Sequence, residues 1–432
     1  MSNHQESPVI INIPEVVTED GVTLYMIVVE IGTVQYKVKQ RYSKFESLHN
    51  KLVEEGVEKD LLPPKKLLGN KEPAFIMKRR KDLETYLRTI FHFFEKNLPS
   101  VLAEFLEFQV YDIHYIVRDL ASNFHDTDLR PQDAGAESQL LTLSPLQLFS
   151  INERMKTPCP PMDTEDKKFD FTNVVDACCN CTNLRIQGSD ELIGTSQLVQ
   201  NQLKIDFLAF KSLTQLHLQH LNISPEQITS LGLLRNTLEI LRANHCNISS
   251  VSQMLLCDVS DKNTDEDLNN IVSLPGYSWS HLLHLDLRYA WKILVCSSDQ
   301  LFNIFSNNNL TSIDRSIRLA ATLTEVNLSS NNIEEISHLT GLPHLRNIDL
   351  SHNNIRDVES LHTKIGQILT LNISGNQIKN LHGLSKLYSV INLDVSSNKL
   401  RTLADVSTVT SLPCIESLTL SPNKVNNEVD YR

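Results

Sequence analysis

Apolar and polar residues alternate along residues 9–39, a stretch rich in Val, Ile, Thr and Tyr. Gly21 and the pair Gly32-Thr33 interrupt this alternation at two points. A period of two residues is typical of strands that bury one face, and glycine commonly marks the turns between such strands. The pattern therefore predicts a meander of three strands.

The residues that follow have helical spacing. Apolar side chains recur every three or four positions in residues 42–54, 74–94 and 99–111, which places them on one face of each segment. Pro63-Pro64 separates the first two segments and favours an extended loop. We therefore predict a small α+β domain over residues 9–115, in which helices accompany the three-stranded meander.

From about residue 213, the chain repeats the pattern apolar-x-x-apolar-x-apolar-x-x-Asn-x-apolar. The asparagines of the clearest copies are spaced 22, 23, 22 and 25 residues apart: Asn331, Asn353, Asn376, Asn398 and Asn423. This is the leucine-rich-repeat pattern, in which each unit contributes a short strand and a turn. Residues 213–432 are therefore predicted to form an α/β solenoid, with these asparagines as a structural ladder along the stack.

One repeat is interrupted. Joining Leu287 directly to Ser306 restores a complete repeat core with Asn308 in the ladder. We therefore interpret the 18 residues 288–305 as an insertion, which an alternative exon or a retained short intron would explain. A tolerated surface loop is the alternative, because lengthening a loop costs little entropy, although Trp291 and its apolar neighbours are unusual for a loop.

Residues 116–212 are less regular and are predicted to connect the two domains, with a proline-rich hinge at residues 157–168. Cys178, Cys179 and Cys181 lie close together in this region. A tetrahedral metal site needs a fourth ligand, and no His or Cys lies at a recognisable spacing from these three. We therefore expect no metal site here.

Composition narrows the range of functions. The net charge of −12 argues against nucleic acid as the main ligand. No secretory signal and no bilayer-spanning apolar run are visible, so we expect a cytoplasmic protein with reduced cysteines. The sequence has no nucleophile elbow, P-loop, dinucleotide fingerprint or His-Glu metal motif. We therefore expect neither enzymatic activity nor a cofactor.

Three basic clusters stand out against this acidic average, at residues 41–45 (Arg-Tyr-Ser-Lys-Phe), 62–66 (Leu-Pro-Pro-Lys-Lys) and 78–81 (Lys-Arg-Arg-Lys). Residues 65–81 carry seven Lys or Arg and one acidic residue. Arginine offers a phosphate a bidentate fork, and lysine offers it a point charge. A tyrosine ring can lie against a sugar-like ring. The clusters therefore predict a site for a phosphorylated ligand, with solvated surface charges as the alternative.

The clusters and the order of the predicted elements resemble the PX (phox homology) domain, a phosphoinositide-binding family. The resemblance implies that Arg41 grips the 3-phosphate and that Tyr42 stacks on the inositol ring. It further implies that Lys65 takes the 1-phosphate, with Lys66 a close competitor, and that Arg79 bonds the ring hydroxyls. Because each position holds the expected residue type, the resemblance implies phosphatidylinositol 3-phosphate as the lipid.

Two further sets of residues have open roles. Four apolar residues flank the proline loop and would either insert into a bilayer or pack into the core: Leu67, Leu68, Ile76 and Met77. The outward strand positions of the repeats hold polar residues that indicate no particular partner: Asn327, Ser329, Asp349, Ser351, Asn372, Ser374, Asp394 and Ser396. The alternative function is therefore a soluble leucine-rich-repeat regulatory protein whose PX-like domain binds protein rather than lipid.

A PX domain followed by leucine-rich repeats resembles the nischarin family of imidazoline-receptor candidate proteins. Residues 60–66, 146–148 and 389–394 carry this resemblance. It implies a scaffold on early or recycling endosomes that binds an integrin tail and restrains Rac and p21-activated kinase signalling in cell migration. The family's long C-terminal region, with its coiled coil and integrin-binding segment, does not follow residue 432 in this sequence. We therefore expect a truncated repeat cap, and integrin binding by this chain is left open.

Overall fold

The structure is a computed structural model of the chain. It describes residues 9–31, 34–65, 72–94, 98–126, 140–156, 167–191, 193, 199–223, 227–259, 271, 274–288 and 308–427. The chain divides into two compact units, of which the first includes Met1–His125 and the second includes Gln200–Arg432.

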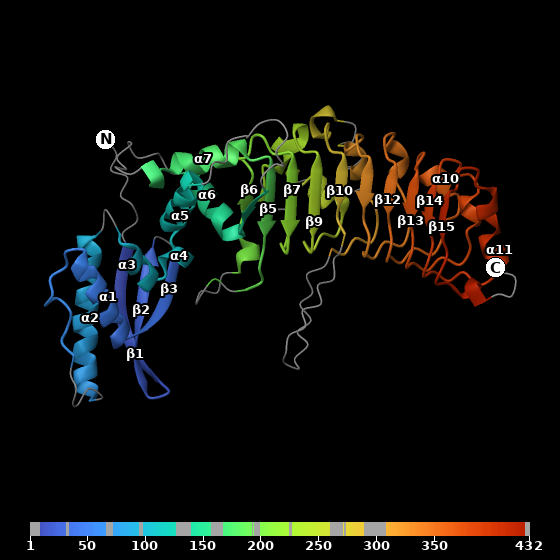
Figure 1. Cartoon of the computed structure of the whole chain (residues 1–432). Coiled ribbons are helices and arrows are strands. Elements are labelled where there is room, and N and C mark those ends of the chain that lie inside the picture. Colours follow the sequence, from blue (N-terminus) through green and yellow to red (C-terminus); the bar gives the residue numbers. More distant parts are fainter. Residues whose placement is uncertain are drawn as a thin grey trace. The chain divides into compact units, whose positions relative to one another are not determined.

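The first unit is built on an antiparallel sheet in the order β1-β2-β3, with helices beside it (Figure 1). The strands are β1 (Val9–Glu19), β2 (Val22–Ile31) and β3 (Val34–Arg41). The helices are α1 (Tyr42–Glu54), α2 (Pro73–Phe93), α3 (Ser100–Phe105), α4 (Phe108–Tyr111) and α5 (Ile113–Asp126). The third predicted helix is divided between α3 and α4 because Glu107 takes a left-handed conformation, with φ of 57°.

Aromatic side chains close the core of this unit. Phe45 of α1 is fully buried and meets the rings of Tyr25 and Phe105 edge-on, at centroid distances of 6.1 and 4.9 Å. Such pairs contribute about 0.5–1.5 kcal/mol beyond the burial of their area. Leu83 and Leu87 of α2 are also fully buried, on the face that the helical period predicted. The core therefore fixes the two helices that carry basic clusters.

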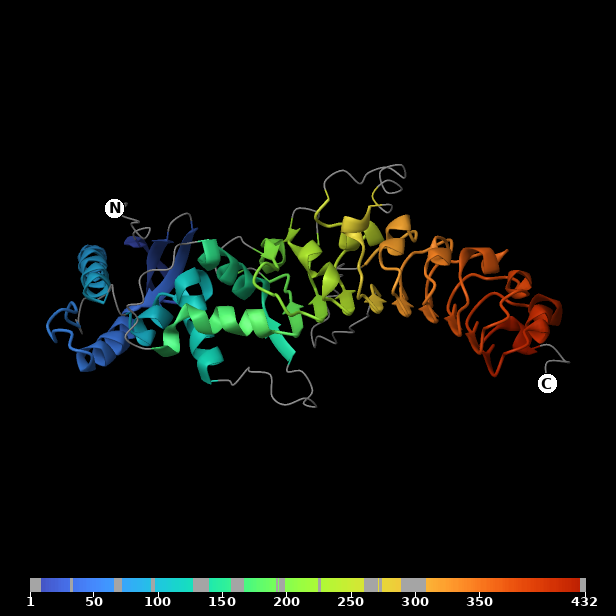
Figure 2. The same ribbon diagram turned by 90° about the horizontal axis from the view of Figure 1, so that it is seen from above.

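A ten-stranded parallel sheet runs through the second unit, and its strands succeed one another in chain order (Figures 1 and 2). They are β4 (Leu140–Leu143), β5 (Asn183–Gln187), β7 (Gln215–Gln219), β9 (Ile240–Asn244), β10 (His284–Asp286), β11 (Glu325–Asn327), β12 (Asn347–Asp349), β13 (Thr370–Asn372), β14 (Asn392–Asp394) and β15 (Ser417–Thr419). A separate pair is formed by β6 (Ile205–Asp206) and β8 (Ile228–Thr229).

Helices and short 3₁₀ turns return the chain from one strand to the next. The helices are α6 (Pro145–Lys156), α7 (Phe171–Asn180), α8 (Val251–Leu255), α10 (Leu361–Lys364) and α11 (Leu403–Val406). The longer 3₁₀ turns are η3 (Leu231–Asn236), η5 (Arg315–Leu319), η8 (Ser407–Ser411) and η9 (Lys424–Asn427). The predicted fold class, an α+β domain followed by an α/β solenoid, is confirmed.

The parallel sheet begins earlier than the sequence indicated. We expected residues 116–212 to connect the domains and the solenoid to start at residue 213, yet β4 and β5 lie in this region, and they join the repeat sheet because β4 pairs with β5 and β5 pairs with β7. Their segments depart from the repeat pattern at an apolar position as well as at the asparagine, with Ser138 before β4 and Glu191 after β5, whereas the repeats of β7 and β9 lack only the asparagine. A strand needs only buried alternate residues and a paired backbone, so the repeat pattern alone could not reveal these two.

Buried asparagines link consecutive repeats. Asn353 Nδ2 donates to the carbonyl oxygens of Leu328 and Leu350, each at 3.0 Å, and its Oδ1 accepts from the backbone N–H of Ile333 at 3.0 Å. The same bonding pattern continues along the stack at Asn331, Asn376, Asn398 and Asn423. Each amide thus satisfies backbone groups of two repeats, and an unsatisfied buried group would cost about 1–3 kcal/mol.

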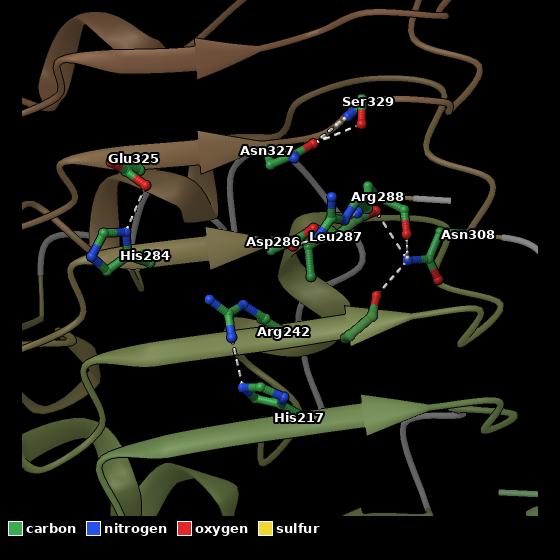
Figure 3. A network of polar contacts seen from close by, with 11 residues as sticks. His217, Arg242, His284, Asp286, Leu287, Arg288, Asn308, Glu325, Asn327 and Ser329 are labelled. Carbon is green, nitrogen blue, oxygen red and sulfur yellow. Dashed lines mark hydrogen bonds and ion pairs between the residues drawn. The ribbon is translucent and has the colours of Figure 1, made fainter. Parts of the chain in front are cut away.

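Asn308 occupies the equivalent position in the interrupted repeat. Its Nδ2 donates to the carbonyl oxygens of Leu287 at 3.0 Å and Arg288 at 3.4 Å, as Asn331 does to Leu328 and Ser329 (Figure 3). The side chain therefore bonds the same two backbone positions as in an uninterrupted repeat. Residues 289–307, which form nearly all of the expected insertion, lie outside the described residues.

Candidate phosphoinositide-binding site

Arg41 ends β3 and caps the start of α1, where the chain turns from strand to helix. Its side chain is exposed and forms no hydrogen bond or ion pair within the described part of the chain. The fully buried Phe45, one helical turn later, holds this end of α1 in the core. The fold therefore presents the guanidinium of Arg41 to solvent from a fixed backbone, beside Tyr42.

The proline loop is held against both helices through its carbonyl groups. Tyr42 Oη donates to the carbonyl oxygen of Pro63 at 2.5 Å, and Arg79 Nη2 donates to that of Pro64 at 3.4 Å. Lys65 follows these two anchored residues directly. The structure thus brings together Tyr42, Lys65 and Arg79, which come from three separate sequence clusters.

Arg79 is buried rather than presented to solvent. It is 7% exposed, and its guanidinium carbon lies 4.2 Å from the ring centroid of Tyr42 and 4.3 Å from that of Phe75. A cation–π contact contributes about 2 kcal/mol when it is desolvated. Its Nε is buried without a partner in the described part of the chain. The contacts of Arg79 therefore order Tyr42 and the proline loop, a role that the sequence did not indicate.

The same environment changes the titration of two tyrosines. Burial raises the pKa of Tyr25 and of Tyr42, and the positive charge of Arg79 opposes the rise in both. Glu46 raises the pKa of Tyr42 further, whereas Lys65 lowers it. Tyr42 therefore stays protonated at neutral pH, as its bond to the carbonyl of Pro63 requires.

Glu46 is a member of the site that sequence reasoning missed. Its carboxylate lies 2.9 Å from Nζ of Lys65, and both side chains remain partly exposed. Glu46 stands one helical turn after Tyr42, so it belongs to the same face of α1. An anion that approaches Lys65 must therefore compete with this carboxylate.

The remaining predicted site residues differ in their surroundings. Met77 is 51% exposed, and Ile76 is half-buried. Lys66, Leu67 and Leu68 lie outside the described residues. In the third basic cluster, Lys78 and Lys81 are exposed, whereas Arg80 donates to the carbonyl oxygens of Ile13 and Pro14 and so joins α2 to β1.

In the solenoid, most of the outward polar residues bond their own turns. Oδ1 of Asn327 accepts from the backbone N–H of Ser329 at 3.0 Å, and Oδ1 of Asp349 accepts from that of Ser351 at 2.9 Å. The bond recurs in each of the next two repeats: Asn372 with Ser374, and Asp394 with Ser396. These side chains therefore serve the repeat itself, in agreement with their consensus character.

Cys178 and Cys181 are buried, and burial raises the pKa of Cys178 and, to about 11, that of Cys181. Within the described ranges, no group of three or more His, Cys, Asp or Glu residues is arranged to hold a metal ion. The described helices include none that is long and apolar enough to cross a membrane.

Comparison with known families matches both units. Residues 29–109 match the PX domain, and residues 321–361 match leucine-rich repeats (2 copies). A PX domain-containing protein kinase-like protein of Rattus norvegicus is 35% identical over 96 residues, which are 22% of this chain and 16% of the relative. The protein of that name in Mus musculus is 34% identical over 96 residues, with the same shares. This chain therefore spans about a sixth of the length of these relatives.

Similar solved structures fall into the same two groups. A designed CISK-PX domain is 28% identical and covers 22% of this chain and 96% of its own, with a TM-score of 0.21. The internalin InlF of Listeria monocytogenes is 18% identical and covers 60% of this chain and 79% of its own, with a TM-score of 0.29. The family matches and the described strands agree that the chain contains a PX domain followed by leucine-rich repeats.

Proposed function

We propose that the PX domain of this chain binds membranes that contain phosphoinositide, with phosphatidylinositol 3-phosphate as the preferred lipid. The observation that carries the proposal is Arg41, an exposed guanidinium without a partner in the described part of the chain, which directly precedes Tyr42 where β3 meets α1. A hydrogen bond to a charged group contributes about 1.5–3 kcal/mol, and a bidentate arginine–phosphate pair adds specificity. The match to the PX domain supports this class of ligand.

The other predicted site residues have separate roles in the proposed lipid site. Arg79 lies against the ring of Tyr42, so the opposite face of that ring receives the inositol. Lys65 exchanges Glu46 for the 1-phosphate, with Lys66 beside it. Arg79 takes the ring hydroxyls only after giving up part of its present contacts. Met77 supplies an exposed apolar side chain for the lipid interface, with Ile76, Leu67 and Leu68 as further candidates.

The leucine-rich repeats present a surface to a protein partner while the PX domain holds the chain on a membrane. In this proposal, the protein is a peripheral, non-enzymatic scaffold of early or recycling endosomes that works without a cofactor. By resemblance to the nischarin family, its partners are an integrin tail, Rac or p21-activated kinase. The support for this role is the succession of a PX domain and repeats in one chain.

One observation favours the alternative that the PX domain binds protein rather than lipid. Lys65 is already paired with Glu46 at 2.9 Å, and an acidic residue in a phosphate site weakens the binding of an anion. A PX domain that did not bind lipid would still keep its fold and the buried Arg79, because the contacts of Arg79 stabilise that fold.

Sedimentation of the full chain with vesicles distinguishes the two functions. The vesicles are phosphatidylcholine alone, or phosphatidylcholine with phosphatidylinositol, its 3-phosphate or its 4-phosphate. The proposal predicts strongest binding to the 3-phosphate and weak binding to phosphatidylcholine alone. Equal binding to all four vesicles would reject the lipid specificity, and binding to none would favour the protein-binding alternative.

A further inference from the structure

One outward-facing position of the repeat strands holds a different type of residue in the first strands than in the later ones. In β10 to β14 this position holds Asp or Asn: Asp286, Asn327, Asp349, Asn372 and Asp394. Each of these side chains accepts a backbone N–H two residues further on. The same position holds Arg185 in β5, His217 in β7 and Arg242 in β9, in direct register. We call these three residues the basic row.

The basic row does not serve the turns of its repeats. An arginine side chain carries donors only and cannot accept a backbone N–H. Arg242 Nη1 instead donates to Nε2 of His217 at 2.8 Å, and the two side chains point toward each other from neighbouring strands (Figure 3). The row therefore replaces a structural residue with a guanidinium in β5 and in β9, and with an imidazole that accepts a hydrogen bond in β7.

The charges of the row are incompletely balanced. Arg185 forms no hydrogen bond or ion pair with any described residue, and its Nε is buried without a partner. Asp286, the next residue in register, forms an ion pair with Arg288 at 3.0 Å, so that carboxylate is shared. His217 is 9% exposed and accepts a hydrogen bond from Arg242. An imidazole carries no negative charge, so His217 does not balance the charge of either arginine. Among the described residues, neither Arg185 nor Arg242 thus has a carboxylate of its own.

We propose that the basic row binds an extended acidic segment of a partner protein. Adjacent strands lie about 4.8 Å apart, so Arg185 and Arg242, two strands apart, are separated by about 10 Å. A polyproline-II segment, which is also extended, has three residues per turn and rises about 3.1 Å per residue, so acidic residues three positions apart lie on one side of it, about 9 Å apart. Each carboxylate can pair with one guanidinium fork.

The surroundings of the row favour a short acidic segment over a long polyanion. Beyond Asp286, the same face carries Asp349 and Asp394, both half-buried. These carboxylates would repel a nucleic acid or an anionic membrane that extended across the sheet. The inference rests on the proposed function only in giving the repeats a protein partner.

Fluorescence anisotropy with the full chain tests the inference. The probe is a labelled Gly/Ser peptide with Glu at every third position, and the control peptide has Gln in place of Glu. The expected result is salt-sensitive binding of the Glu peptide alone. Arg185→Gln should weaken it about tenfold, since a charge-assisted bond contributes about 1.5–3 kcal/mol. Arg185 forms no hydrogen bond or ion pair with a described residue, so this variant should fold.

Arg356→Gln is the matched control, because it removes one exposed positive charge elsewhere on the solenoid and should leave peptide binding unchanged. The inference is overturned if the two peptides bind alike, or if Arg185→Gln has no effect. It is also overturned if Arg185→Gln weakens binding to phosphoinositide vesicles but not to the peptide. Peptide binding is measured without lipid, so failure of the lipid proposal would not affect its outcome.

Discussion

At the scale of single residues, the candidate lipid site is defined by which of its charges are already paired. Arg41 is unpaired in the described structure, Lys65 is paired with Glu46, and Arg79 is enclosed by aromatic rings. Substitution of each residue should therefore have a different effect.

Glu46→Gln should strengthen binding to vesicles that contain phosphatidylinositol 3-phosphate. The change frees Lys65 and removes a negative charge from the site. Exposed ion pairs contribute about 0.2–1 kcal/mol, so the gain in affinity should be about two- to fivefold. Glu54→Gln, on the exposed side of the same helix, is the control and should have little effect. Unchanged or weaker binding by Glu46→Gln would show that Lys65 does not contact the lipid.

Arg79→Ala should loosen the PX domain, whereas Arg41→Ala should not. Arg79 is buried between two aromatic rings, and loss of such contacts costs about 2 kcal/mol or more. Hydrogen exchange in α1 and α2 should accelerate in Arg79→Ala and stay at the wild-type rate in Arg41→Ala. Equal exchange rates in the two variants would contradict the structural role of Arg79.

His217 should make the solenoid less stable in acid. Burial, with the charges of Arg242 and Arg185, lowers the pKa of His217 from 6.5 to about 4. The folded state therefore binds fewer protons than the unfolded state between these values, so stability is lost as the pH falls from 6.5 toward 4. Over the 2.5 units between 6.5 and about 4, at about 1.4 kcal/mol per pKa unit, the loss is about 3–4 kcal/mol.

An NMR titration of the His217 ring should give a midpoint near pH 4, and His217→Gln should flatten the stability profile over this range. A midpoint near 6.5 would mean that the imidazole is solvated and that its bond to Arg242 is not maintained.

At the scale of elements, the sequence indicated those parts that depend on local pattern. The alternation over residues 9–39 predicted β1 to β3, and the Leu and Asn spacing predicted the strands from β7 onward. Strands β4 and β5 were missed because they extend the same sheet but their segments break the apolar spacing of the repeats as well as lacking the ladder asparagine. The spacing of residues along the chain could not show that neighbouring strands place Arg185, His217 and Arg242 in one row.

The candidate lipid site was likewise predictable from the sequence only in part. Motif order identified Arg41, Tyr42, Lys65 and Arg79 as candidates, since their residue types occur in the order of the PX domain. The pairing of Lys65 with Glu46 depends on how the proline loop returns to α1, which no local pattern encodes. The burial of Arg79 likewise depends on two rings from different helices.

Deletion of residues 288–305 should leave the stack intact. Asn308 already bonds the carbonyls of Leu287 and Arg288, and the deletion places Ser306 where Arg288 stands, in the position of Ser329 in the next repeat. The thermal midpoint of the full chain should change by less than about 2 °C, although the Arg288–Asp286 ion pair is lost. A fall of several degrees would show that the segment contributes to the packing of the solenoid.

At the scale of the whole molecule, the proposed function gives the two units different ligands. In that proposal, the PX domain takes a phosphorylated lipid through Arg41 and its neighbours, and the repeats take a protein through the strand face. Each assignment is tested by a variant in one unit and a ligand for that unit. The lipid assignment is central, because it determines whether the chain acts at a membrane.

The most direct test is the affinity of full-length Arg41→Ala for vesicles containing phosphatidylinositol 3-phosphate, beside wild type and Lys51→Ala. Lys51 is an exposed residue of α1 whose loss removes the same charge away from the site. The account predicts at least about tenfold weaker binding for Arg41→Ala, because one charge-assisted contact contributes about 1.5–3 kcal/mol. It also predicts wild-type binding for Lys51→Ala. Unchanged binding by a folded Arg41→Ala variant would contradict it.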